Sequence, residues 1–121
     1  MRELSAAARD YFAHPRQVIE GEPLGVTTVQ AELPSGEILQ LQLRVSPPDL
    51  IAEARFKAYG CAWLIACGSR LSERLTGRTL AEAEQFRHHE LIEALNVPPE
   101  KLHCAVLAET ALHMALRTRP D

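Results

Sequence analysis

Hydrophobic and polar positions alternate along three stretches in the first half of the chain. The alternation is strict over residues 38–45, where Leu39, Leu41, Leu43 and Val45 face one way and Gln40, Gln42 and Arg44 the other. A period of two is typical of a strand with one buried and one wet face. Residues 26–33 are rich in β-branched side chains. Residues 50–60 alternate again, with Leu50, Ala52, Ala54, Phe56 and Ala58 as the apolar set. The pattern predicts three strands.

A helical period replaces the alternation after Gly60. Apolar residues from position 62 fit a helix that ends at Gly77, and Thr79-Leu80-Ala81-Glu82 has the form of a capping box that opens another. Further helices are expected over 89–95 and about 100–117, the latter started by Pro98-Pro99. Residues 2–13 predict a short amphipathic helix that breaks before Pro15.

Short connections between successive strands favour an antiparallel meander. Three strands followed by helices predict an α+β fold, a three-stranded antiparallel sheet with helices packed on one face. The chain shows no internal repeat, low-complexity segment or linker, so residues 1–121 are expected to form a single domain.

Composition excludes several classes of function. The net charge of -3, without a basic cluster, gives no general affinity for nucleic acid. No apolar run approaches the ~20 residues of a membrane span, and the polar N-terminus lacks a signal-peptide core. Three cysteines, an odd number, argue against a disulfide framework. We therefore expect a cytoplasmic protein with reduced thiols.

Cys61, His103 and Cys104 are the candidate chemical groups. Cys61 follows a glycine where a strand meets a helix, and His103 and Cys104 lie near the start of the last helix. Helix N-termini favour thiolates, which zinc and iron–sulfur clusters select as ligands. The consecutive His103 and Cys104 point about 100° apart, so they would meet a metal only at its edge. The alternative is that both cysteines are small buried hydrophobes.

Several segments together resemble one family. They are Phe12-Ala13-His14-Pro15-Arg16, Arg55-Phe56-Lys57-Ala58-Tyr59-Gly60-Cys61, Thr79-Leu80-Ala81-Glu82-Ala83 and the run from Glu93 to Glu109. In this order and spacing they resemble the iron–sulfur cluster assembly scaffold family, of the IscU/NifU N-terminal type. Ser35-Gly36-Glu37 falls where that family has Cys-Gly-Asp. The resemblance covers nearly the whole chain and implies the family's α+β fold.

The resemblance implies a surface site made of three cysteines, a histidine and an aspartate. There a [2Fe–2S] cluster is built with sulfur from a cysteine desulfurase and passed to iron–sulfur acceptor proteins. Cys61, His103 and Cys104 match two of the cysteines and the histidine. Ser35 replaces the remaining cysteine, and Glu37 replaces the aspartate.

The replacements in the loop leave three chemical alternatives. Because a serine hydroxyl is a harder ligand than a thiolate, Ser35 suits an iron–sulfur cluster poorly. Cys61, His103, Cys104 and Glu37 could close a tetrahedral zinc site. They could also hold iron or a cluster more weakly, with Glu37 or Ser35 as an oxygen ligand. In the third alternative, the loop's role as acceptor of persulfide sulfur is lost together with de novo assembly.

The segment Val97-Pro98-Pro99-Glu100-Lys101 resembles the family motif that an Hsp70-type chaperone recognises in extended form. Pro98, Pro99 and Lys101 match that motif, and the same lysine precedes the site histidine. Glu100 places a charge where the family has valine, and a hydrophobic groove would desolvate it at a cost of about a few kcal/mol. The resemblance thus implies weakened chaperone binding, and starting a helix is an adequate role for both prolines.

The remaining candidates have plainer explanations. Cys67 is interpreted as a core residue, and Trp63 as a core residue, a cover for the site or a partner contact. His88 and His89 are expected in a solvated connection between helices. No nucleophile–base arrangement is present, so the chain is not expected to be an enzyme. The hypothesis is a scaffold-like protein, and the alternative is a metal-free adaptor that binds assembly partners.

Overall fold

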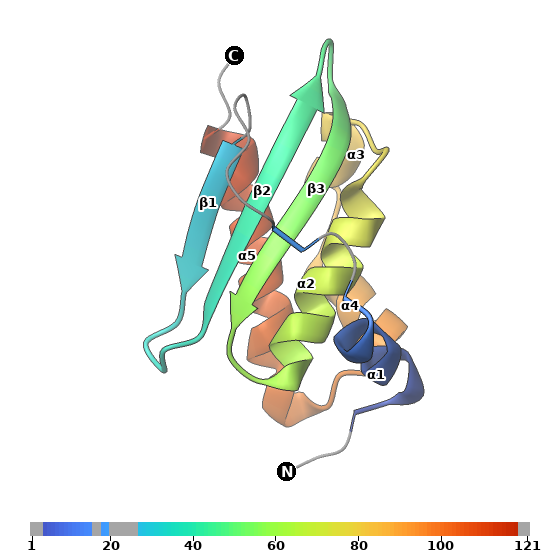
Figure 1. Ribbon diagram of the computed structural model, residues 1–121, viewed down its shortest axis with the longest axis vertical. Coiled ribbons are helices and arrows are strands. Elements are labelled where there is room, and N and C mark those ends of the chain that lie inside the picture. The colour runs from blue at the N-terminus through green and yellow to red at the C-terminus, as the bar shows by residue number, and fades with distance from the viewer. Residues whose placement is uncertain (1–3, 16–17, 20–26, 119–121) are drawn as a thin grey trace.

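The computed structural model describes residues 4–15, 18–19 and 27–118. Its elements follow the predicted order of strands and helices (Figure 1). They are α1 (Ala6–Ala13), β1 (Thr27–Glu32), β2 (Ile38–Ser46), β3 (Leu50–Tyr59), α2 (Ala62–Leu75), α3 (Leu80–Glu84), α4 (His88–Leu95), the 3-10 turn η1 (Pro99–Lys101) and α5 (Leu102–Thr118). The predicted connection up to Gly25 lies largely outside the described residues.

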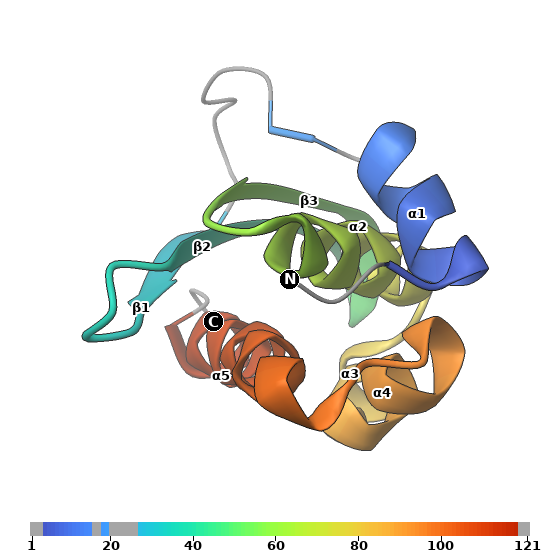
Figure 2. The ribbon, with the colours of Figure 1, turned by 90° about the horizontal axis from the view of Figure 1, so that it is seen from below.

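The three strands form an antiparallel meander in the order β1-β2-β3. Figure 2 shows α2 and α5 side by side beneath one face of this sheet, with α1 against α2. The predicted α+β class and the one-sided packing of the helices are therefore confirmed. Inward-facing side chains such as Leu39, Leu41 and Leu43 are buried against the helices.

One register shift changes the face assignment at the start of β3. Arg44 pairs with Glu53 but Val45 pairs with Ile51, so Ala52 has no opposite residue. An extra residue of this kind moves every side chain beyond it to the other face. Ile51 is consequently buried, whereas Leu50 is 40% exposed. The prediction that Leu50 and Ala52 belong to the apolar face was wrong, since the shift is invisible in the alternation.

Gln42 also departs from the prediction of a wet face. It lies on the central strand, where its cross-strand neighbours are Thr28 and Arg55. Its side-chain amide donates a hydrogen bond to Thr28 Oγ1 at 3.4 Å. Gln42 is 3% exposed on the central strand, which has a neighbouring strand on each side.

Local capping sets the helix boundaries. α1 begins at Ala6 rather than residue 2, because Ser5 caps it by accepting a hydrogen bond from Ala8 N. The predicted capping box of Thr79 and Glu82 is present at α3. α4 ends at Asn96, whose left-handed backbone (φ 54°) stops the helix before the two prolines. Among the described residues, no helix is long and apolar enough to cross a membrane.

Gly68 marks the closest approach of α2 to the sheet. A Cβ atom there would lie 2.6 Å from Phe56 Cδ2 and 3.1 Å from Leu39 Cδ1. Both neighbours are buried core side chains of the sheet, so neither can move away freely. A glycine in the middle of a helix lowers the stability of the helix by about 1 kcal/mol relative to alanine. Close packing against the sheet explains why glycine occupies position 68 despite this cost.

We expect Gly68→Ala to lower the free energy of unfolding by about 1–3 kcal/mol, since overpacking outweighs the gain in helix propensity. Chemical denaturation of Gly68→Ala, Phe56→Leu and the double variant measures this. The double variant should lose less unfolding free energy than the two single variants lose together, because leucine at position 56 relieves the contact with the added methyl group. Additive effects, or a stabilised Gly68→Ala, would contradict the packing assigned to α2.

Candidate metal centre

Strand register brings the candidate residues together at one end of the sheet. Ile38, the first residue of β2, pairs with Tyr59, the last of β3. Glu37, just before Ile38, therefore lies beside Gly60, just after Tyr59. The β1–β2 turn is closed by hydrogen bonds from Leu33 N to Glu37 O and from Gly36 N to Leu33 O, both 2.9 Å long.

Gly60 allows the turn to approach this closely. A Cβ atom at position 60 would lie 3.2 Å from Glu37 Cγ and 2.9 Å from Leu64 Cδ2. Next along the chain, Cys61 is the N-cap residue of α2, and its side chain makes no capping hydrogen bond. The Cys61 thiol is thus positioned by the strand-to-helix junction and left available for other contacts.

The start of α5 supplies the remaining groups. His103 Nε2 lies 3.1 Å from Glu37 Oε2, and Cys104 Sγ lies 3.7 Å from Cys61 Sγ. Ligand atoms of Glu37, His103 and Cys104 all lie within 4.8 Å of one another. His103 and Cys104 point in different directions around α5, as expected. His103 turns to Glu37 of the hairpin, and Cys104 turns to Cys61 at the start of α2. The structure thus brings three of the five predicted metal ligands into one cluster, and Cys61 adjoins it through its contact with Cys104.

Ser35 and Lys101 lie near this cluster with different exposure. Ser35 is exposed, and its hydroxyl donates to Glu37 Oε1 over 3.4 Å. It therefore contacts the carboxylate oxygen other than the one facing His103. Lys101, partly buried, ends the turn η1 two residues before His103. Ser35 thus sits at the solvent side of the candidate centre.

Burial gives the two site cysteines different properties. Cys104 is fully buried, whereas Cys61 is partly exposed. Burial raises the pKa of the Cys104 thiol well above its ordinary value, and the sulfurs of Cys61 and Cys67 and the Glu37 carboxylate act in the same direction. The expectation that a helix N-terminus would favour the thiolate is wrong for Cys104, because desolvation outweighs the helix field.

A cation would fit the cluster for a structural reason. The Oε2 atom of Glu37 is shielded from solvent and accepts no well-aligned hydrogen bond within the described chain, although His103 Nε2 is close. A buried carboxylate oxygen is costly without a donor or a cation. Two sulfurs, one imidazole and one carboxylate form a donor set that zinc and iron accept.

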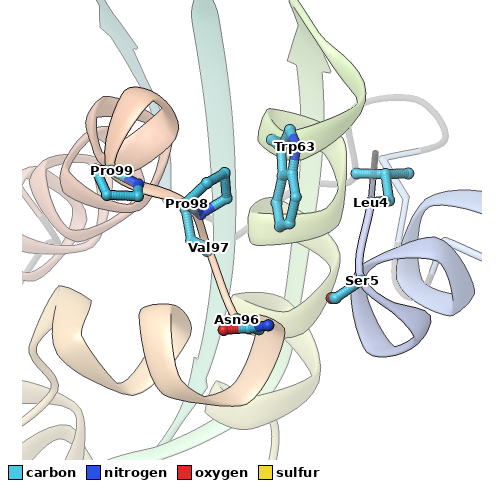
Figure 3. A pocket seen from close by; sticks show the side chains of 7 residues that line it. All are labelled: Leu4, Ser5, Trp63, Asn96, Val97, Pro98 and Pro99. Carbon is cyan, nitrogen blue, oxygen red and sulfur yellow. The ribbon is translucent and has the colours of Figure 1, made fainter. Parts of the chain in front are cut away.

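Cys67 and Trp63 lie in the core. Cys67 is fully buried in α2, and burial together with the Cys61 sulfur raises the pKa of its thiol to about 12. Trp63 is 2% exposed, so the core interpretation is confirmed. It nevertheless lines a pocket of about 550 Å³ with Leu4, Ser5 and Asn96–Pro99 (Figure 3). Sequence patterns gave no signal of this pocket, because three distant segments form it.

The segment proposed for chaperone recognition is partly inside the fold. Val97 and Pro98 are buried, while Pro99 and Glu100 are exposed. Pro99 opens η1, as its expected role in starting a helix requires. Recognition of this segment in extended form would require it to leave the core. The partner role of Pro98, Pro99 and Lys101 remains a prediction.

The prediction that His88 and His89 lie in a connection between helices was wrong, because both residues begin α4. His89 is exposed, as expected, whereas His88 is partly buried. The His88 backbone N–H donates to Glu109 Oε1 of α5, and His88 Nδ1 lies 2.9 Å from the same oxygen. Burial opposes ionisation of Glu109, but these hydrogen bonds hold its pKa below the ordinary value. Glu109 therefore caps α4 from another helix, a tertiary contact that the sequence does not reveal.

Known proteins are similar to this chain in sequence and in fold. The family model of the NifU-like N terminal domain matches residues 4–120. The chain is 39% identical over 111 residues to the iron–sulfur cluster assembly scaffold protein IscU of Azotobacter vinelandii, covering 89% of this chain and 87% of that protein. It is 34% identical over 110 residues to IscU of Escherichia coli K12, covering 88% and 86%.

A solved structure supports the fold independently. A candidate iron–sulfur cluster assembly scaffold protein of the SUF system from Fervidobacterium islandicum superimposes with a TM-score of 0.69 at 22% identity, covering 93% of this chain and 95% of that one. At this identity the likeness concerns the fold alone. Taken with the family model and the relatives, the chain belongs to the NifU-like N-terminal domain family.

Proposed function

We propose that this protein is an iron–sulfur cluster assembly scaffold that holds iron or a [2Fe–2S] cluster, as cargo, at Cys61, His103, Cys104 and Glu37. The observation that carries the proposal is the convergence of these ligand atoms from three separate segments. Relatives that are 34–39% identical over most of the chain are named as assembly scaffolds. Zinc is the alternative occupant of the same ligands.

With Ser35 in the loop in place of a thiol, other residues of the site must accept sulfur and supply the missing ligand. Its exposed hydroxyl cannot accept persulfide sulfur as a thiol does. Cys104 is buried and holds its proton strongly, so Cys61 is the accessible thiol. We infer that sulfur from a cysteine desulfurase is received at Cys61, and that Glu37 supplies an oxygen ligand where a scaffold with three cysteines has a thiolate.

Other partners follow from the family and from burial. Iron–sulfur acceptor proteins would receive the cluster at this exposed end of the sheet. Binding of an Hsp70-type chaperone through Pro98, Pro99 and Lys101 is weakened, because the segment must first open and because Glu100 is charged. We further propose that residues 1–121 act as one non-catalytic domain in the cytoplasm.

A metal-free adaptor is the second candidate, and one contact favours it. Glu37 and His103 approach to 3.1 Å and form an ion pair once His103 carries a proton, which closes the site without a metal. An adaptor would bind a desulfurase equally well before and after treatment with a chelator. Pull-down of the desulfurase with chelator-treated and iron-loaded protein separates the two functions.

We expect Cys61→Ala and Cys104→Ala each to weaken zinc binding more than about 100-fold, since each removes a ligand from the centre. The control is Cys67→Ala, which deletes a buried thiol of the same helix as Cys61 and should keep the affinity of the wild type. Competition titration against a chromogenic chelator measures all four proteins. Unchanged binding in both ligand variants would refute the metal centre.

The zinc affinity measured in the same titration should depend on pH. Because Cys104 holds its proton strongly in the metal-free protein, binding must release that proton. Zinc affinity should therefore rise as the pH increases from about 6 to about 8.5. A flat profile would show that Cys104 is not a ligand.

Gly60→Ala should weaken zinc binding about tenfold, because the added methyl group displaces Glu37 from its place beside Gly60. Gly77→Ala is the matched control, since Gly77 has a left-handed backbone (φ 86°) with no atom within 4 Å of an added Cβ. That variant should lose stability but keep its zinc affinity. Equal zinc affinities in the two variants would show that the position of Glu37 does not matter.

A further inference from the structure

Two thiols face each other at the candidate centre. Cys61 Sγ and Cys104 Sγ lie 3.7 Å apart and belong to the starts of two different helices, α2 and α5. A disulfide requires the two sulfurs to approach to about 2.05 Å, which side-chain rotation can supply when the Cβ atoms are close. The pair closes a long loop that includes α2, α3 and α4.

Among the described residues, Cys61 and Cys104 are the two thiols in contact. The loop that approaches them carries the hydroxyl of Ser35, which cannot form a disulfide. Cys67 is fully buried within α2, six residues beyond Cys61, and so lies on a different side of that helix. Cys61 is exposed enough to meet a small oxidant, whereas Cys104 is reached only from within the protein.

We propose that Cys61 and Cys104 form a reversible disulfide when a peroxide oxidises the metal-free protein. In the first step the Cys61 sulfur attacks one oxygen of hydrogen peroxide, which breaks the O–O bond and gives a sulfenic acid and water. In the second step the Cys104 sulfur attacks the Cys61 sulfur. The S–O bond breaks, the Cys104 proton leaves with the hydroxyl group as a second water, and an S–S bond remains.

This disulfide regulates the centre of the proposed function, on which that part of the inference rests. Both thiols are ligands there, so the oxidised protein keeps only His103 and Glu37 and cannot hold iron, a cluster or zinc. Bound metal in turn occupies both sulfurs and shields Cys61 from peroxide. A dithiol reductant returns the pair to thiols by exchange, its own two thiols becoming a disulfide.

The test exposes metal-free wild type, Cys61→Ser, Cys104→Ser and Cys67→Ala to hydrogen peroxide. Intact mass and non-reducing peptide maps are then recorded. Wild type and Cys67→Ala should lose the mass of two hydrogen atoms and give one linked peptide pair, Cys61 with Cys104, that dithiothreitol reverses. Cys104→Ser should instead accumulate a sulfenic acid at Cys61, captured as a dimedone adduct. A pair that contains Cys67, a dimer between chains, or over-oxidation of Cys61 without a disulfide would overturn the proposal.

A zinc-loaded sample distinguishes this inference from the proposed function. Zinc should slow disulfide formation at least about tenfold, and the disulfide should abolish zinc binding until it is reduced. If the reduced protein binds no zinc but still forms the disulfide, the redox pair stands and the metal centre fails. If the reduced protein binds zinc but peroxide forms no disulfide, the metal centre stands and the redox pair fails.

Discussion

The candidate centre depends on the strand register at the end of the sheet where β2 begins and β3 ends. Pairing of Ile38 with Tyr59 sets Glu37 against Gly60 and so fixes the hairpin over the first turn of α2. A slip by one residue would turn Glu37 to the other face and separate it from His103. The centre also depends on the absence of a side chain at Gly60, since this allows the hairpin to approach the start of α2 closely.

The same packing sets the chemistry of the sulfurs. α5 packs against both α2 and the sheet, which buries Cys104 while Cys61 stays at the protein surface. Burial keeps the Cys104 thiol protonated, so it is a ligand only for a metal able to displace that proton. In the proposed function, the partly exposed Cys61 is the group that would meet sulfur donors or oxidants. The two thiols of the candidate centre thus differ in exposure, one partly exposed and one buried.

Alternation and capping signals were sufficient to predict the three strands, the Thr79 capping box and the order of the helices. They could not reveal the register shift at Ala52, because a bulge depends on the partner strand and not on the local pattern. The resemblance located the candidate ligands, but the approach of His103 to Glu37 and the burial of Cys104 arise only when distant segments pack. The Glu109 cap on α4 and the Trp63 pocket were missed for the same reason.

Anaerobic reconstitution with iron, sulfide and a cysteine desulfurase tests the central claim most directly, with absorption spectra recorded for the wild type and for Ser35→Cys. If two thiolates, an imidazole and the Glu37 carboxylate suffice, the wild type will show the absorption of a [2Fe–2S] cluster, and Ser35→Cys will hold that cluster more tightly. A cluster that appears only in Ser35→Cys would contradict the account, since it would mean that scaffold function requires a third thiol.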